Sequence, residues 1–297
     1  MYSKSEIDKL MKAGHIAALA REYGKTLVKG GASVLDIADK IEAKIVELGG
    51  QPAFPTDVSI NEMAAHHCPA FGEKTILKNG DLVKLDLGAH IDGFMSDTAV
   101  TISVGNVKED LLLIQAVEDA LAAAIKLCTP GREVWEIGKA IQDTITKAGF
   151  APIRNLSGHL IQRHDLHSDI TIPNTNNRNK TKLEDGMVIA IEPFATTGDG
   201  LVNDVREFQV FRVKNVKNMR TNRDVLEFVL DTYETMPFCA RWLIKKFGVL
   251  KTNLALKEMV AKGILHEYTG LKEISEKNTA QAEHTIIIGT APLVTTA

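Results

Sequence analysis

The chain has 297 residues, of which 44% are hydrophobic and 25% are charged, a mixture typical of globular proteins. This composition excludes a disordered chain or a fibre, three widely spaced cysteines exclude a disulfide scaffold, and a formal net charge of −3 gives no general attraction to nucleic acid or anionic lipid. Because the N-terminus has no apolar leader and no stretch approaches roughly 20 apolar residues, we expect a cytoplasmic protein without a membrane span.

Two amphipathic helices are predicted at the start of the chain. The first begins at Ser3 and Glu6, which have the spacing of a capping box. The second carries apolar residues at helical spacing from Val34 to Leu48 and ends at Gly49, where a positive φ costs little. Both helices need a surface on which to bury their apolar faces.

An internal repeat follows. The apolar pattern of residues 31–49 returns one hundred residues later, in residues 131–149. Two predicted strands also match, because each runs from a glycine through alternating apolar residues to a carboxylate, Asp86 in the first and Glu192 in the second. The sequence therefore predicts an α/β or α+β fold of two related halves, with these two carboxylates near a pseudo-twofold axis.

The pair Asp92-Gly93 lies between two strand-like runs and predicts a hairpin with a two-residue turn. This turn pairs Gly88 with Asp97, and it places Asp86 and Asp97 diagonally on one face, about 7 to 8 Å apart at the backbone. We expect Gly88 to leave empty volume between them, because glycine has no side chain. Two carboxylates can converge there on a common ion.

In the second half, Glu283 begins an apolar strand and corresponds to Asp97. It follows Glu192 by 91 residues, whereas the first pair is 11 residues apart, so about 80 residues form an insertion between paired strands. Helical periodicity in residues 224–236, 240–247 and 254–262, followed by short strand-like runs in residues 263–272, predicts a winged-helix-like subdomain. We expect residues 1–214 and 273–297 to form the main domain and residues 215–272 the insertion.

Four carboxylates in one place repel one another and lose hydration unless they are protonated or bound to cations. Two divalent ions balance this charge and activate water for attack on a carbonyl, so metal-assisted hydrolysis is the predicted reaction class. Oxygen-rich ligands with one imidazole suit manganese, iron or cobalt at least as well as zinc. Histidines at turn-rich positions can complete the coordination or donate to the transition state: His66, His67, His159, His164 and His167.

These features together resemble the type II methionine aminopeptidases, and the absence of a long polar N-terminal extension resembles the archaeal kind. The resemblance covers nearly the whole chain. It is carried by AFPT at 53–56, AAH at 64–66, KLDLG at 84–88 with Asp97, NLSGH at 155–159, AIEPF at 190–194 and AQAEHT at 280–285. It implies the pita-bread fold, a duplicated α/β arrangement with a two-metal site, and an insertion of the type II kind.

The resemblance also implies roles for single residues. Asp97 and Glu283 would bridge both metal ions, and Glu192 would also move a proton. His66 would contact the substrate beside the scissile bond, and His167 would steady the peptide carbonyl or the oxyanion. The methionine pocket would be lined by Phe54 and Leu166. The full set of implied metal ligands is Asp86, Asp97, His159, Glu192 and Glu283.

The implied function is removal of the initiator methionine from nascent proteins whose second residue is small, by a metal-bridging hydroxide that attacks the first peptide bond. The metals would be two ions of cobalt, manganese, iron or zinc, and the partner would be the N-terminal methionine of a nascent chain. We expect a monomer. Two departures from the family pattern, at His67-Cys68 and at Leu166, bear on pocket shape and leave the ligand set intact.

Two other functions stay open. An Xaa-Pro aminopeptidase or prolidase shares the fold and the metals but carries a larger N-terminal domain. A non-catalytic protein of the same fold would use the insertion to bind RNA or protein. The run from Arg212 to Arg223 holds five basic residues and no acid, which allows a transient ribosome contact, although a solvated loop is the simpler interpretation.

Overall fold

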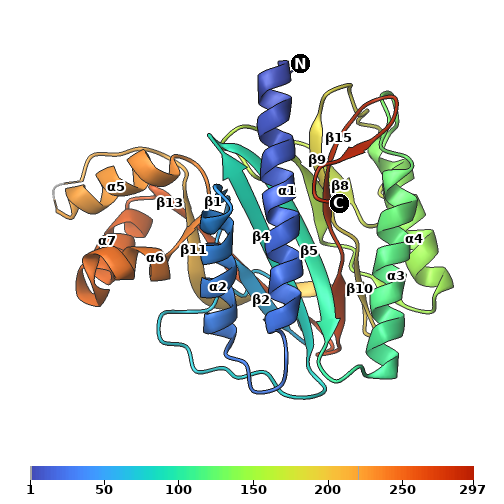
Figure 1. Ribbon diagram of the computed structural model, residues 1–297, viewed down its shortest axis with the longest axis horizontal. Helices are drawn as coiled ribbons and strands as arrows, with labels where there is room; N and C mark the ends of the chain where they lie inside the picture. The colour runs from blue at the N-terminus through green and yellow to red at the C-terminus, as the bar shows by residue number, and fades with distance from the viewer. Residues whose placement is uncertain (1, 220) are drawn as a thin grey trace.

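The computed structural model describes residues 2–219 and 221–297, so Met1 and Arg220, the latter part of the basic run, lie outside it. Four helices cover one side of the strands: α1 (Lys4–Leu27), α2 (Val34–Glu47), α3 (Lys108–Ile125) and α4 (Val134–Lys147). Figure 1 shows α1 lying across the central strands, with α3 and α4 packed together beside it. The predicted capping box is confirmed, because Ser3 and Glu6 satisfy each other's backbone N–H groups at the start of α1.

The strands of the first half surround one long central strand. They are β1 (Gln51–Pro52), β2 (Asp57–Ile60), β3 (Met63–Ala65), β4 (Leu82–Ile91) and β5 (Phe94–Ser103). Strand β4 pairs antiparallel with β1, β2 and β5. The predicted hairpin is confirmed: Gly88 pairs with Asp97, and both turn residues, Asp92 and Gly93, have positive φ.

The second half has more and shorter strands. They are β6 (Ala151–Pro152), β7 (Ser157–Ile161), β8 (Thr171–Pro173), β9 (Val188–Ile191), β10 (Phe194–Thr196), β14 (Thr279–Gln281), β15 (His284–Ile287) and β16 (Leu293–Val294). One sheet has the order β16-β15-β9-β7-β8, and another has the order β14-β10-β6. Strand β15 pairs with β9, so the predicted insertion does lie between paired strands.

The predicted repeat is confirmed in the structure. Helices α2 and α4 each have 14 residues, and each is preceded and followed by a glycine with φ between +84° and +90°. Only a residue without a side chain adopts this conformation cheaply, which explains why the glycines recur. Each half has its own apolar core beneath its helix pair.

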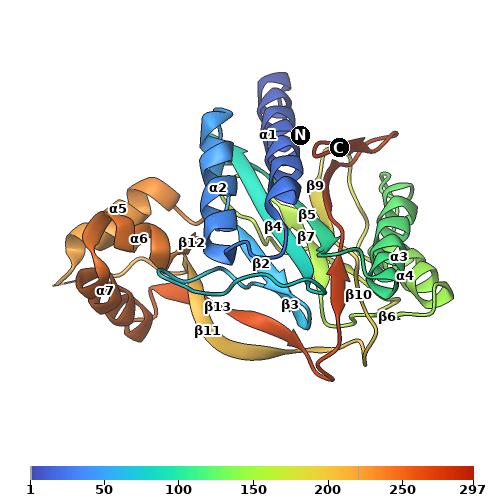
Figure 2. The same ribbon diagram turned by 60° about the horizontal axis from the view of Figure 1, so that its bottom comes forward.

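The inserted residues form helices α5 (Arg223–Tyr233), α6 (Ala240–Phe247) and α7 (Val249–Ala261) around a separate apolar core. The short strand β12 (Phe238–Cys239) precedes α6. The short strand-like runs predicted after these helices form one strand, β13 (Leu265–Glu273), which pairs with β11 (Val202–Val213) on both sides of a bulge between Val205 and Val210. Figure 2 shows β11 and β13 running on the opposite side of the strands from α1–α4. The domain boundaries at residues 214 and 273 stay a prediction.

Within the described part of the chain, no helix combines the length and the apolar character needed to cross a membrane.

Candidate active site

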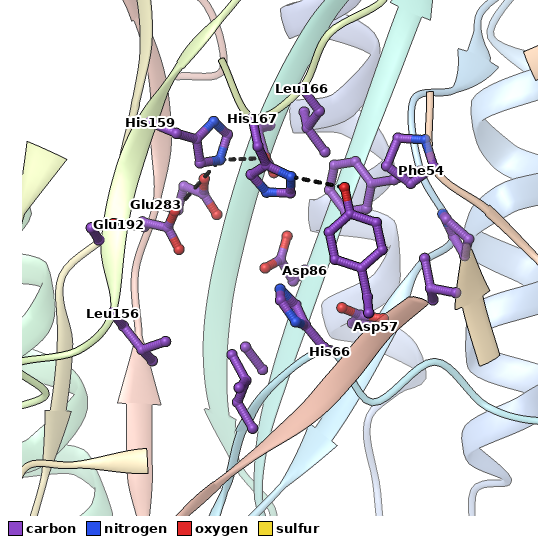
Figure 3. Close-up of a pocket in the computed structure, with 18 of the residues that line it drawn as sticks. Phe54, Asp57, His66, Asp86, Leu156, His159, Leu166, His167, Glu192 and Glu283 are labelled. Carbon is purple, nitrogen blue, oxygen red and sulfur yellow. Dashed lines mark hydrogen bonds and ion pairs between the residues drawn. The ribbon is translucent and has the colours of Figure 1, made fainter. Parts of the chain in front are cut away.

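All the side chains to which the resemblance gives a role line one cavity of about 330 Å³, whereas the candidate histidines His67 and His164 do not. Its walls come from both halves and from the β11–β13 pair, so residues far apart in sequence meet there. Figure 3 shows His159, Glu192 and Glu283 on one side of the cavity and His66 and Asp86 on the other. The predicted residues that line it are Phe54, His66, Asp86, Asp97, His159, Leu166, His167, Glu192 and Glu283.

The two halves are joined directly at the carboxylates. Thr285 donates its hydroxyl to the Asp97 carbonyl at 2.8 Å, and the Asp97 backbone N–H donates to the same hydroxyl at 2.7 Å. The Glu283 backbone N–H donates to the carbonyl of Ala99 at 3.1 Å. These bonds fix β5 against the start of β15, so the equivalent residues Asp97 and Glu283 lie next to each other at the junction.

The innermost group consists of Asp97, His159 and Glu283, which each offer one ligand atom within 4.8 Å of the others. The Nε2 atom of His159 lies 3.5 Å from Asp97 Oδ2 and 3.5 Å from Glu192 Oε1. Gln281 donates to Asp86 at 3.0 Å and to Glu283 at 3.2 Å, which holds these two carboxylates toward the same centre. Asp86 and Glu192 therefore lie next to the innermost group, Asp86 through Gln281 and Glu192 beside His159.

The expected empty volume at Gly88 is not there. A Cβ atom at this position would lie 2.5 Å from Phe54 Cε1 and 2.5 Å from the carbonyl oxygen of Ser96. Gly88 therefore makes room for the Phe54 ring rather than for an ion. Phe54 and Leu166 are both buried and belong to one apolar cluster that forms part of the cavity wall.

Burial and mutual repulsion disfavour negative charge at this centre. Loss of hydration, followed by the charges of neighbouring carboxylates, raises the pKa of Asp86, Glu192 and Glu283 well above the ordinary range. Loss of hydration also raises the pKa of Asp97 to about 7. The same cause lowers the pKa of His159 to about 4, so its imidazole is neutral at neutral pH and its nitrogen can act as a ligand.

Two further histidines face the cavity from different elements. His66 follows β3 with a φ of 62°, a left-handed conformation that is uncommon outside glycine and is often found at functional sites. Its Nδ1 donates to the carbonyl of Thr269 at 3.1 Å, which leaves Nε2 as an acceptor in the neutral ring. His167 Nδ1 shares a hydrogen bond of 3.3 Å with the Tyr268 hydroxyl (Figure 3). Burial lowers the pKa of both histidines.

Sequence reasoning missed several residues that line the cavity, among them Asp57, Arg212, His266 and Tyr268. Asp57 directly follows the AFPT motif but reaches the site because it pairs with Asp86 between β2 and β4. Tyr268 and His266 reach it through the pairing of β13 with β11. The sequence held one signal, because Asp57 is an acidic residue next to the AFPT motif. The strand pairing that brings Asp57 opposite Asp86 could not be predicted from the local pattern.

Comparison with known proteins agrees with this geometry. The family model of metallopeptidase family M24 matches residues 8–226. The chain belongs to family M24. A methionine aminopeptidase from Pyrococcus horikoshii is 45% identical to it over 286 residues, which cover 95% of this chain and 96% of the relative. The resemblance to methionine aminopeptidases, and with it the class of metallo-exopeptidase, is confirmed.

Solved structures of M24 members share the fold. A methionine aminopeptidase from Thermotoga maritima has a TM-score of 0.74 and 25% identity and covers 99% of this chain and 98% of its own. A prolidase from Pyrococcus furiosus has a TM-score of 0.66 and 19% identity and covers 100% of this chain but 65% of its own. The predicted pita-bread fold is confirmed.

Membership of a metallopeptidase family implies divalent metal ions, and the residues present suit them. Asp86 Oδ1, Asp97 Oδ1 and Glu283 Oε1 are buried and have no hydrogen-bond partner within residues 2–219 and 221–297. Buried acceptors without partners are costly, and a bound divalent cation would satisfy these oxygens together. Carboxylates with one imidazole are a common ligand set for divalent transition metals.

Proposed function

We propose that this protein removes the N-terminal methionine from polypeptides whose second residue is small. One observation carries the proposal: a buried group of carboxylates and one imidazole lies beside an apolar wall in a single cavity. The 45% identity to a methionine aminopeptidase over 95% of the chain supports the same activity. On this proposal the protein acts as a monomer in the cytoplasm on nascent chains, and a transient ribosome contact at an unassigned surface is compatible with it.

The proposed metal site holds two divalent ions of cobalt, manganese, iron or zinc. Such ions supply a nucleophile from water at neutral pH and withdraw electrons from the scissile carbonyl. Asp97 and Glu283 are the proposed bridging ligands, which is supported by their adjacent, equivalent positions in the two halves. The full proposed ligand set is Asp86, Asp97, His159, Glu192 and Glu283.

The remaining polar side chains have complementary proposed roles. Glu192, at the edge of the group beside His159, accepts the proton of the attacking water and passes it to the leaving amine. His66 presents a free Nε2 because its Nδ1 is bound to Thr269, so it can accept the N–H of the scissile amide. His167 is held by Tyr268 and steadies the peptide carbonyl or the oxyanion.

Selectivity follows from the walls of the cavity. Phe54 and Leu166 form the proposed methionine pocket, and the space beside His66 limits the second residue to a small side chain. Discrimination of this steric kind is worth about 1 to 3 kcal/mol for each methylene.

The proposal is tested with a peptide panel and protein loaded separately with manganese, cobalt, iron or zinc. We expect methionine release from Met-Gly and Met-Ala peptides, little release from Met-Leu peptides, and none from the N-acetylated Met-Gly control. A preference for Xaa-Pro peptides would instead support a prolidase. Absence of all turnover in protein with metal bound would leave a non-catalytic binding protein.

A further inference from the structure

Asp57 is an additional carboxylate that the proposed ligand set does not use. It lies on β2 directly opposite Asp86 on β4, so both side chains are on the same face of the sheet. Its side chain lines the cavity with only 6% of the residue exposed. Its Oδ1 atom is buried and has no hydrogen-bond partner in the described part of the chain. An unpaired buried acceptor aimed into a cavity indicates a missing donor.

Asp57 lies at the end of the carboxylate row farthest from Glu192. Burial, followed by the charges of Asp86 and Asp97, raises the pKa of Asp57 well above its ordinary range. Figure 3 shows Asp57 close to His66 and apart from Glu192 and Glu283. It therefore lies on the His66 side of the cavity, outside the innermost ligand group.

Because Asp57 and Asp86 are buried and directly opposed, a negative charge on Asp57 is costly unless a positive group or a donor lies near it. The backbone N–H of His66 favours the charged form of Asp57 but is a single donor. A peptide substrate with a free N-terminus brings a group of the required kind, since its α-amino group has several N–H donors and can carry positive charge.

We propose that Asp57 accepts a hydrogen bond from the free α-amino group of the substrate and so helps to select N-terminal residues. The identity of the substrate rests on the proposed function. An acylated or internal residue has one amide N–H and no charge in place of the α-amino group. It would leave the repulsion between Asp57 and Asp86 uncompensated. Asp57 is in this proposal a substrate-binding residue and not a metal ligand.

The test compares two small probes that differ only in the amino group and have no amide bond to hydrolyse: L-methioninol and 4-(methylthio)butan-1-ol. Their dissociation constants are measured by calorimetry on metal-loaded wild type, Asp57→Asn and Asp57→Ala. We expect Asp57→Ala to weaken binding of methioninol by roughly 10- to 100-fold, as for loss of a charge-assisted hydrogen bond. The desamino probe should bind all three proteins alike, and Asp57→Asn should give an intermediate result.

Asp204→Asn is the matched control, because this exposed carboxylate also acts electrostatically on His66 but does not line the cavity. It should leave the ratio of the two dissociation constants unchanged. Equal weakening of both probes would mean that Asp57 only shapes the pocket, and loss of bound metal in Asp57→Asn would make it a ligand; either result overturns the proposal.

If Asp57→Ala fails to fold, the dissociation constants of the two probes on the nearly isosteric Asp57→Asn decide between these outcomes. The experiment measures binding and does not depend on turnover. Failure of the wild type to cleave methionyl peptides would overturn the proposed function, but it would not alter the ratio of the two dissociation constants.

Discussion

At the scale of single residues, the site depends on buried carboxylates whose charged form is unfavourable when no cation is bound. Glu283 is 1% exposed, and loss of hydration and three neighbouring carboxylates raise its pKa. The same features that make this carboxyl unfavourable alone make it a strong ligand once positive charge is present. The proposed bridging role of Glu283 agrees with this change from an unfavourable buried carboxylate to a strong ligand.

Glu283→Ala should therefore lose bound metal and activity together. A proposed bridging ligand contacts both ions, so the loss of metal affinity should exceed the roughly 10- to 100-fold change found for residues that only support a ligand. Metal content after dialysis and hydrolysis of a Met-Gly peptide measure the two effects. Glu22→Ala, which removes an exposed carboxylate on α1, should change neither. Full activity in Glu283→Ala would refute the assignment.

At the scale of elements, helices α2 and α6 are joined by a buried ion pair. Arg241 is 1% exposed, and its Nη1 and Nη2 atoms each donate to Glu42 at 2.8 Å. Trp242 Nε1 donates to the same carboxylate at 2.8 Å. The inserted helices are thus fixed to the first half of the main fold through Glu42, together with Asp39, which accepts from Arg241 and Lys245.

Replacing that glutamate should uncouple the two elements. Glu42→Ala leaves the Arg241 guanidinium buried without its main partner, and we expect the free energy of unfolding to fall by about 3 to 5 kcal/mol. Chemical denaturation measures this change. Glu227→Gln, in an exposed pair with Arg223 on α5, is the control and should have no measurable effect. A Glu42→Leu, Arg241→Met double variant should recover much of the loss, and an unchanged midpoint in Glu42→Ala would contradict the account.

The hairpin and the repeat could be predicted because their signals are local. Asp92-Gly93 encodes a two-residue turn, and this turn alone sets the register of Asp86 and Asp97. Asp57 and Tyr268 could not be predicted, because they reach the cavity through strand pairings that no local pattern specifies. The space at Gly88 was misjudged for a related reason, since Phe54 enters it from a different segment. The roles of the predicted site residues stay predictions.

At the scale of the whole molecule, the proposed metal site lies between the two halves. Asp86 and Asp97 belong to the first half, whereas His159, Glu192 and Glu283 belong to the second. Ions bound there would link the two apolar cores and remove the repulsion between the carboxylates. Metal ions that bind the native state and not the unfolded state stabilise the native state by mass action.

Removal of metal should therefore lower the melting temperature. At a free metal concentration about 100 times the dissociation constant, binding contributes about 2.7 kcal/mol, which corresponds to a shift of about 5 °C or more. Scanning calorimetry with and without a chelator measures the shift. Glu283→Ala should show a much smaller difference between the two conditions. Identical melting curves for wild type with and without metal would exclude a structural link through the site.

Strand β13 connects the inserted helices to the histidines of the candidate active site. Two consecutive residues on it hold the two imidazoles outside the ligand group: Tyr268 is bonded to His167, and the carbonyl of Thr269 is bonded to His66. A small displacement of this strand would rotate both rings at the same time. Any molecule that docks on α5–α7 and shifts β13 would thus alter the rate of peptide cleavage without entering the cavity.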